Sequence, residues 1–241
     1  MAFDTNRMYA GSASRTMDRA AYDAGLRSYM LSVYNYMASG LALTGIVAYI
    51  IAATPALYQP LFGTPLKWVV MLAPLGLVFF FSFKLESMKA STAHTIFWVF
   101  AGLMGASMAT VFLAFTGASV ARVFFITAGT FAAMSLYGYT TKRDLSKFGS
   151  FLIMGVIGLI LASLVNIFLA SSALHFAISA IGVLLFVALT AYDTQRIKEI
   201  YADHYDGETI SKLTISGALT LYLDFINLFM FLLQFLGVRR E

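Results

Sequence analysis

Two aspartates stand out because each lies in or beside a long apolar segment. Asp193 directly follows a long stretch without charged residues, and Asp224 lies in the middle of a second apolar segment. A charged Asp at the centre of a membrane helix costs about 2.5 to 3.5 kcal/mol on insertion scales, so such a residue normally faces a bundle interior or a water-filled cavity. These two carboxyl groups are the first candidates for a functional site.

The spacing of the two aspartates predicts that their side chains lie at the same depth. Their midpoint in the sequence falls between residues 208 and 209, within the turn-like stretch Asp206-Gly207-Glu208. If the helices on either side form an antiparallel hairpin, each Asp is about 15 residues from the turn. We therefore expect the first helix to continue past Asp193 to about Tyr201, and the second to begin near Thr209.

Weaker polar residues accompany the aspartates. A helix turns about 100° per residue. On that basis five polar residues of the last helix point in directions within about 80° of one another and form a polar stripe: Ser216, Thr220, Asp224, Asn227 and Gln234. We predict that this stripe faces the bundle interior, where the preceding helix presents Asp193 and Thr190. Asn166 is a further polar residue in an apolar segment, and we expect it to bond to a neighbouring helix.

Two level carboxyl groups in a low-dielectric bundle cannot both ionise freely, because each charge is desolvated and repels the other. Such a pair shares a proton at low pH and holds a cation when it is ionised. A hard divalent ion suits oxygen ligands of this kind. We therefore predict a proton-sensitive cation site whose metal ligands are Asp193 and Asp224.

The composition excludes several other classes of protein. Of the 241 residues, 60% are apolar and 12% are charged, and there is no Cys, whereas soluble proteins have roughly 25% charged residues. The absence of Cys excludes a thiol enzyme, a disulfide scaffold and a Cys-built metal site. With so few charges, the net charge of +4 reflects loops beside a lipid bilayer, so we expect no nucleic-acid partner.

Long intervals without Asp, Glu, Lys or Arg predict an all-α integral membrane protein, because a membrane span needs about 20 apolar residues. The longest interval, Phe148–Tyr192, must hold two helices, and Ser171-Ser172 is its best turn. Pro55, Pro60 and Pro65, with Gly63, predict an extended loop after the first span. We expect seven transmembrane helices, at about Met30–Ala53, Leu66–Phe83, Thr95–Phe115, Val120–Tyr139, Gly149–Ala170, Leu174–Thr194 and Leu213–Leu236.

The lysines and arginines predict the orientation in the membrane. Twelve of the sixteen fall on the N-terminal tail and on the loops that share its side, so the positive-inside rule places the N-terminus in the cytoplasm. Arg239 and Arg240 would also lie on the cytoplasmic side if the last apolar segment were a re-entrant hairpin. That segment has no central Gly or Pro at which to bend, so we expect it to cross the membrane. We divide the chain into a polar cytoplasmic arm, 1–27, and a transmembrane domain, 28–241.

The segments around the two aspartates resemble the Bax-inhibitor family of membrane proteins. The matching stretches are Ala191-Tyr192-Asp193-Thr194-Gln195 and Leu221-Tyr222-Leu223-Asp224-Phe225-Ile226-Asn227-Leu228-Phe229. The resemblance covers about Ser28–Val238 and implies seven helices with the last near the bundle centre. It also implies a pH-sensitive calcium leak with a paired-aspartate sensor at Asp193 and Asp224, with Ca²⁺ as the bound or transported ion and no other cofactor. In some members a basic residue at the end of the second span latches the pair, and Lys84 or Lys89 stands in that region here.

Two alternative functions stay open. Some family members bind and modulate a membrane AAA protease, and here the arm and the Gln195–Lys212 loop are the candidate contact surfaces. An intramembrane aspartyl protease also uses two aspartates on neighbouring helices, but such enzymes carry Gly-x-Gly before the second Asp, where this chain has Leu221-Tyr222-Leu223. We therefore expect no enzymatic activity. Short loops and the lack of an organelle-type signal favour a bacterial inner membrane.

Overall fold

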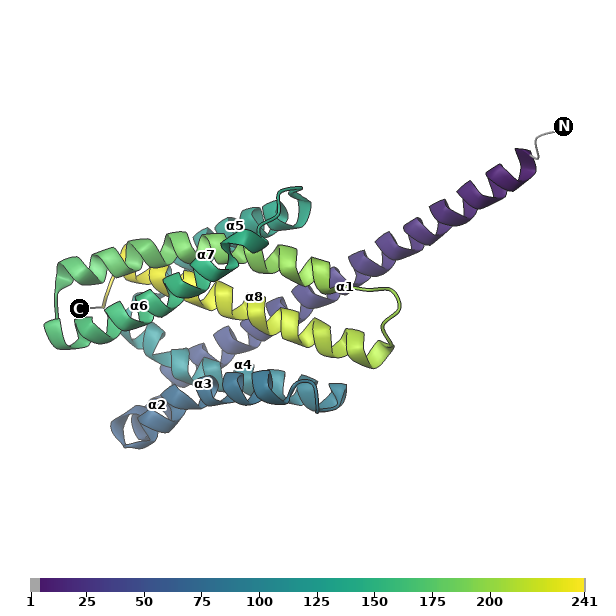
Figure 1. Ribbon diagram of the computed structural model, residues 1–241. Coiled ribbons are helices and arrows are strands. Elements are labelled where there is room, and N and C mark those ends of the chain that lie inside the picture. The colour runs from purple at the N-terminus through teal and green to yellow at the C-terminus, as the bar shows by residue number, and fades with distance from the viewer. Residues whose placement is uncertain (1–4, 241) are drawn as a thin grey trace.

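The computed structural model describes the backbone of residues 5–240 and the side chains of residues 20–240. This part of the chain is almost entirely helical, and seven of its helices are long and apolar enough to cross a membrane (Figure 1). The predicted all-α fold with seven spans is confirmed. The helices are α1 (Thr5–Ala53), α2 (Pro55–Gly63), α3 (Leu66–Lys84), α4 (Ala90–Ala114), α5 (Gly117–Thr140), α6 (Gly149–Leu169), α7 (Ser172–Ile200) and α8 (Gly207–Leu236), with a short 3₁₀ turn at Ser146–Phe148.

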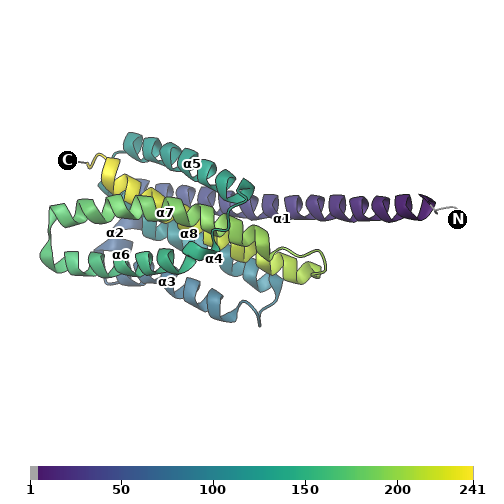
Figure 2. The same cartoon turned by 45° about the horizontal axis from the view of Figure 1, so that its top comes forward.

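Helix α8 occupies the centre of the bundle, as predicted. It packs against α1, α4, α5 and α7, whereas α3 lies at the edge against α4, and α6 lies at the edge against α7 (Figures 1 and 2). More than half of the residues in its most apolar stretch are buried, a larger share than in any other spanning helix. A polar residue on α8 is therefore held away from lipid.

The two ends of the described chain lie on opposite faces of the bundle (Figures 1 and 2). The start of α8 contacts the start of α4, where the Ala90 backbone N–H donates to the Glu208 carboxylate. Beyond the other end of α8, Arg239 pairs with Phe115 after α4 in an isolated antiparallel bridge. Since α8 begins at one end of α4 and finishes at the other, it crosses the whole bundle, and a re-entrant last segment is excluded.

The segment with three prolines differs from the prediction. The extended loop expected there was wrong, because residues 55–63 form helix α2. Pro55 is the first residue of this helix. At this position a backbone N–H would have no partner within the helix, so its absence in proline costs nothing, and the fixed φ of proline suits a helix.

The predicted N-terminal arm is continuous with the first span. Helix α1 begins at Thr5 and passes the expected boundary at residues 27 and 28 without a break, and its first part projects from the bundle (Figure 1). Leu26 and Tyr29 on either side of that boundary are already buried. Residues 1–4 of the expected arm and residue 241 of the expected domain lie outside the described residues.

A polar junction joins three helices in the apolar core. The Thr44 hydroxyl of α1 donates to the Ala101 carbonyl oxygen of α4 over 2.8 Å, and the Tyr222 hydroxyl of α8 lies 2.7 Å from the same threonine oxygen. Since the single threonine proton is engaged, the tyrosine donates. The Tyr222 ring is fully buried and packs edge-on against Phe97 and Phe100 of α4. This junction holds α8 against α1 and α4.

Gly138 allows α5 to approach α7 closely. A Cβ atom at this position would collide with the backbone of Ala191, two residues before Asp193. By contrast, a Cβ at Gly129 on the same helix would meet open space. The missing side chain at residue 138 therefore sets the distance between α5 and the part of α7 that carries Asp193.

Replacing Tyr222 by Phe removes the hydroxyl and keeps the buried ring. We expect the free energy of unfolding to fall by about 0.6 to 1.7 kcal/mol, the range typical of hydrogen bonds between membrane helices. The measurement is unfolding by dodecyl sulfate from mixed micelles. The control is Tyr137→Phe, which removes an exposed hydroxyl on α5. Equal stability of the two variants would contradict the role of the junction.

Replacing Gly138 by Ala forces α5 away from α7. We expect this change to lower stability, although Ala favours a helix over Gly by about 1 kcal/mol. Gly129→Ala, the control with the same chemical change, leaves stability unchanged or raises it slightly. Both are read in the same unfolding assay, and a Gly138→Ala variant as stable as Gly129→Ala would show that the close approach is not required.

Candidate functional site

The structure brings Asp193 and Asp224 side by side. Asp193 lies on α7, Asp224 lies at the middle of α8, and residues 201–206 connect the two antiparallel helices. Both side chains are buried, with exposed fractions of 8% and 5%, and the two carboxyl groups are close enough for each to act on the other. A hydrogen bond between two carboxyl groups requires a proton on one of them, which it donates to an oxygen of the other. Two adjacent carboxyl groups of this kind can share one proton.

The turn before α8 keeps the two aspartates level. Asp206 caps the helix, because its carboxylate accepts from the Thr209 backbone N–H over 2.8 Å. The hydrogen bonds from the Thr209 hydroxyl and backbone N–H also hold the pKa of Asp206 below its usual value. The helix starts at Gly207, close to the start expected near Thr209.

One oxygen of the pair has no partner. Asp224 Oδ2 is buried and accepts no hydrogen bond from the described residues. A buried polar atom without a partner costs about 1 to 3 kcal/mol, and more when it is charged. This oxygen is therefore a place where a proton or a cation would be stabilised.

A small cavity lies beside Asp193, on the side toward the N-terminal face. It has a volume of about 120 Å³, enough for several water molecules. The hydroxyl-bearing side chains of Ser216 and Thr220 on α8 lie in its wall, so two residues of the predicted polar stripe share this space with Asp193. Its lining residues are Tyr29, Asp193, Arg196, Ile197, Ile200, Leu213, Ser216, Gly217 and Thr220.

The threonine hydroxyl groups near the two aspartates can still accept a hydrogen bond or coordinate a cation. Thr190, fully buried on α7, donates to the Phe186 carbonyl oxygen, and Thr220 donates to the Ser216 carbonyl oxygen. A hydroxyl that donates its proton retains lone pairs for another donor or for a cation. The carboxyl pair therefore has neutral oxygen atoms in its neighbourhood.

The positive charge that acts on Asp193 comes from Arg196, three residues along α7. The predicted latch residues, Lys84 and Lys89, are exposed and lie elsewhere. Their loop contacts the start of α8, where Lys212 donates to the Glu86 carbonyl oxygen. That turn is about 18 Å from Asp224 along the helix, at about 1.5 Å per residue. The loop after α3 thus contacts the first turns of α8 and not its middle, and the structure does not bring Lys84 or Lys89 to the aspartates.

Three other predicted polar residues lie away from the cavity. Asn227 is half-buried, and its side-chain amide donates to the Leu223 carbonyl oxygen of its own helix. Asn166 accepts from the Ser171 backbone N–H in the turn between α6 and α7, at the opposite end of the bundle. It thus stabilises a turn instead of bonding another span. Gln234 is exposed and accepts from the Ser179 hydroxyl.

Residues next to Asp193 that the sequence analysis did not assign hold α7 in place. The Gln195 side chain donates to the Arg143 carbonyl oxygen and accepts from the Leu145 backbone N–H, both over 2.8 Å. Thr194 donates to the Ser135 hydroxyl of α5 over 3.3 Å. The sequence signal that could have identified Thr194 and Gln195 is that both are polar and directly follow a long apolar segment. These bonds fix the rotation and depth of α7, and hence of Asp193.

The pair offers two carboxylates and no more. Among the described residues no cluster of three or more His, Cys, Asp or Glu side chains could hold a metal ion. Ca²⁺ takes six to eight oxygen ligands, so waters and nearby hydroxyls would have to complete its shell.

Comparison with known proteins places the chain in a family. The family described as "Inhibitor of apoptosis-promoting Bax1" matches residues 26–241. An uncharacterized protein of Rickettsia prowazekii is 49% identical over 97% of this chain and 99% of its own length. The inner membrane protein YbhL of Escherichia coli is 47% identical over 90% of this chain and 94% of its own length. The chain is a multi-pass membrane protein and belongs to the Bax-inhibitor family.

Proposed function

We propose that this protein is a pH-sensitive cation leak channel, with Ca²⁺ as the preferred ion and the Asp193–Asp224 pair as its sensor. The observation that carries the proposal is the contact between two buried carboxyl groups inside a membrane-crossing bundle. The unpartnered Asp224 Oδ2 supports it, because an oxygen of this kind gains most from binding a proton or a cation.

Protons and Ca²⁺ compete for the same oxygens in this mechanism. With one proton present, the hydrogen bond between the aspartates ties α7 to α8. When that proton leaves, two negative charges face each other in a medium of low dielectric and repel. A divalent cation relieves the repulsion, and carboxylate oxygens are the ligands that Ca²⁺ prefers. The pair therefore changes from a helix-joining bond to a cation site as the pH rises.

The ion path is closed in this arrangement. A cavity lies beside Asp193 on the side of the N-terminal face, but on the far side α8 packs tightly, with Leu228 and Leu233 fully buried. Passage of an ion requires α7 and α8 to separate at the pair. The helix-joining hydrogen bond opposes that separation, which is why we assign the gate to the aspartates.

The setting of the channel is a bacterial inner membrane with the N-terminus in the cytoplasm. The E. coli relative is named an inner membrane protein. The N-terminal end of α1 lies at the same end of the bundle as the loops after α3, α5 and α7 (Figure 2), and with these loops it carries most of the lysines and arginines. Because such residues favour the cytoplasmic side, the cavity beside Asp193 opens toward the cytoplasm.

Replacing Asp224 by Asn tests the sensor directly. In liposomes with an enclosed calcium dye, we expect the wild-type flux to depend on pH and the Asp224→Asn flux to be nearly independent of it, because the amide neither takes a proton nor carries a charge. Glu199→Gln removes a carboxylate from an exposed position on α7 and leaves the pH profile as it is. An unchanged pH profile in the Asp224→Asn variant would overturn the proposal.

Replacing Arg196 by Gln tests the route from the cavity. The guanidinium repels a cation that approaches Asp193, so we expect the variant to bind Ca²⁺ several-fold more tightly, measured by titration calorimetry in detergent at neutral pH. The control is Arg143→Gln, which removes one positive charge from a loop and keeps the backbone carbonyl that bonds to Gln195. We expect this variant to bind Ca²⁺ with unchanged affinity. Weaker binding in the Arg196→Gln variant would show that this residue assists the cation instead.

A further inference from the structure

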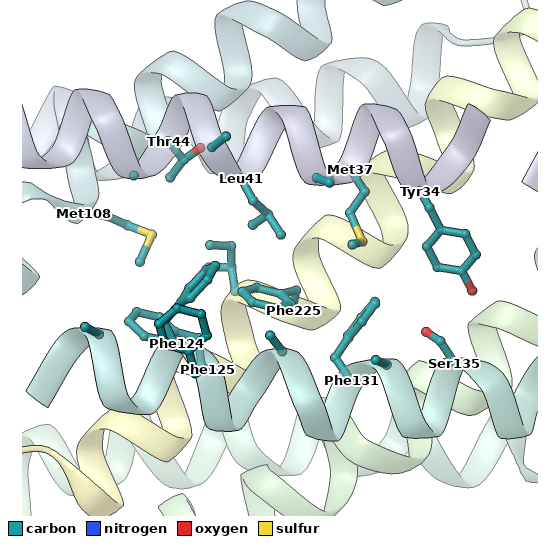
Figure 3. A pocket seen from close by; sticks show the side chains of 18 of the residues that line it. Tyr34, Met37, Leu41, Thr44, Met108, Phe124, Phe125, Phe131, Ser135 and Phe225 are labelled. Carbon is teal, nitrogen blue, oxygen red and sulfur yellow. The ribbon is translucent and has the colours of Figure 1, made fainter. Parts of the chain in front are cut away.

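A long apolar groove lies between α1 and α5, on a different side of α8 from the carboxyl pair. Its volume is about 1200 Å³. Met37 and Leu41 of α1 face Phe124 and Phe131 of α5 across the groove, and Phe225 of α8 lies on its floor (Figure 3). Thus the floor of the groove is the helix that also carries Asp224.

Small residues on both walls keep the groove open. Ala38, Ala42 and Gly45 line it from α1, and Ala128 and Ala132 line it from α5. Helix α1 packs mainly on α4 and α8, and α5 packs mainly on α7 and α8. The two walls therefore share α8 as a floor but do not close over it.

The length of the groove matches a lipid bilayer. Its lining on α1 extends from Arg27 to Ala48, which is about 32 Å at about 1.5 Å per residue. The hydrocarbon core of a bilayer is about 30 Å thick. Large exposed apolar side chains, among them Leu31, Ile46 and Phe125, lie along the lining, as expected for a groove that opens sideways to lipid tails.

The width of the groove favours a chain over a helix. Packed helix axes lie about 8 to 10 Å apart, so α1 and α5, which share α8, are separated by at most about 20 Å. Each helix with side chains is about 10 to 12 Å across, which leaves about 10 Å or less between the walls. Since Met37, Leu41 and Phe131 also reach into this space (Figure 3), an acyl chain fits and a further transmembrane helix does not.

Most polar groups of the lining gather at one end of the groove, since the Thr44 hydroxyl farther along is already bonded to Ala101 and Tyr222. Arg27 lies in its lining at the N-terminal face, with Tyr34 of α1 and with Ser135 and Tyr139 of α5 close to that end. The Lys198 ammonium lies 5.0 Å from the centre of the Tyr139 ring. The opposite end, around Ala48 and Val120, has apolar lining residues. A guanidinium and hydroxyls at one end of an apolar slot are complementary to an anionic phosphate group attached to a hydrocarbon chain.

We propose that this groove binds an anionic phospholipid of the leaflet on the N-terminal side, with an acyl chain along α8 and the headgroup phosphate at Arg27. The chain lies along the floor at Phe225 and covers the small residues of the two walls. The headgroup lies near the membrane surface, where Arg27 and the hydroxyls of Tyr34 and Tyr139 hold it. This binding site is independent of the Asp193–Asp224 pair and does not rest on the proposed channel function.

Native mass spectrometry of the full chain in detergent tests the proposal, with phosphatidylglycerol and phosphatidylcholine of identical acyl chains as probes. We expect the protein to retain the anionic lipid several-fold more than the zwitterionic one. Ala132→Phe fills the groove and reduces retention of both lipids several-fold. Ala133→Phe, the neighbouring exposed residue outside the lining, leaves retention as in the wild type.

The charge at the end of the groove is tested separately. Arg27→Gln removes the preference for the anionic lipid, whereas Arg122→Gln on α5, outside the lining, preserves it. Equal retention of the two lipids by the wild type, or equal retention by the Ala132→Phe and Ala133→Phe variants, would overturn the proposal. The proposal would also be overturned if the protein formed a dimer in place of binding lipid and only Ala132→Phe abolished that dimer, because the groove would then bind a second copy of the chain.

Discussion

The central constraint on this bundle is that two carboxyl groups lie together in an apolar interior, where charge is poorly solvated. Two charges at this spacing repel strongly in a low dielectric, so Asp193 and Asp224 need a shared proton or a cation between them. The arrangement of helices around the pair serves that need. The hairpin of α7 and α8 sets the depth, the central position of α8 excludes lipid, and a small cavity lies beside Asp193.

The position of α7 is held by bonds that lie just outside the pair. Gln195 ties it to the loop after α5, Thr194 ties it to Ser135, and Gly138 lets α5 approach the Ala191 backbone. Because these contacts follow or precede Asp193 by only a few residues, a movement of α5 or of its following loop would shift that carboxyl group. The gate we propose is therefore coupled to α5 as well as to α8.

Helix α8 serves two different environments at neighbouring residues. Asp224 faces the carboxyl pair, and Phe225, the next residue, lies on the floor of the apolar groove. Successive residues on a helix point about 100° apart, so a single turn can contact both a titrating site and a hydrocarbon chain. The Tyr222 hydroxyl fixes a third side of the same turn against Thr44. The middle of α8 is thus where the packing, the candidate cation site and the groove meet.

The amino-acid sequence alone determined the all-α class, the seven spans and the pairing of Asp193 with Asp224 at one depth. These follow from hydropathy, from helix geometry and from the position of the turn near Asp206, which are all local properties. Only the tertiary structure decided the surroundings of the pair. It placed Arg196 beside Asp193 and the loop of Lys84 and Lys89 far along α8, left Asn166 at a turn, and opened the groove between α1 and α5. These features depend on which helices pack together, and neighbouring apolar spans of similar composition carry little local signal for that choice.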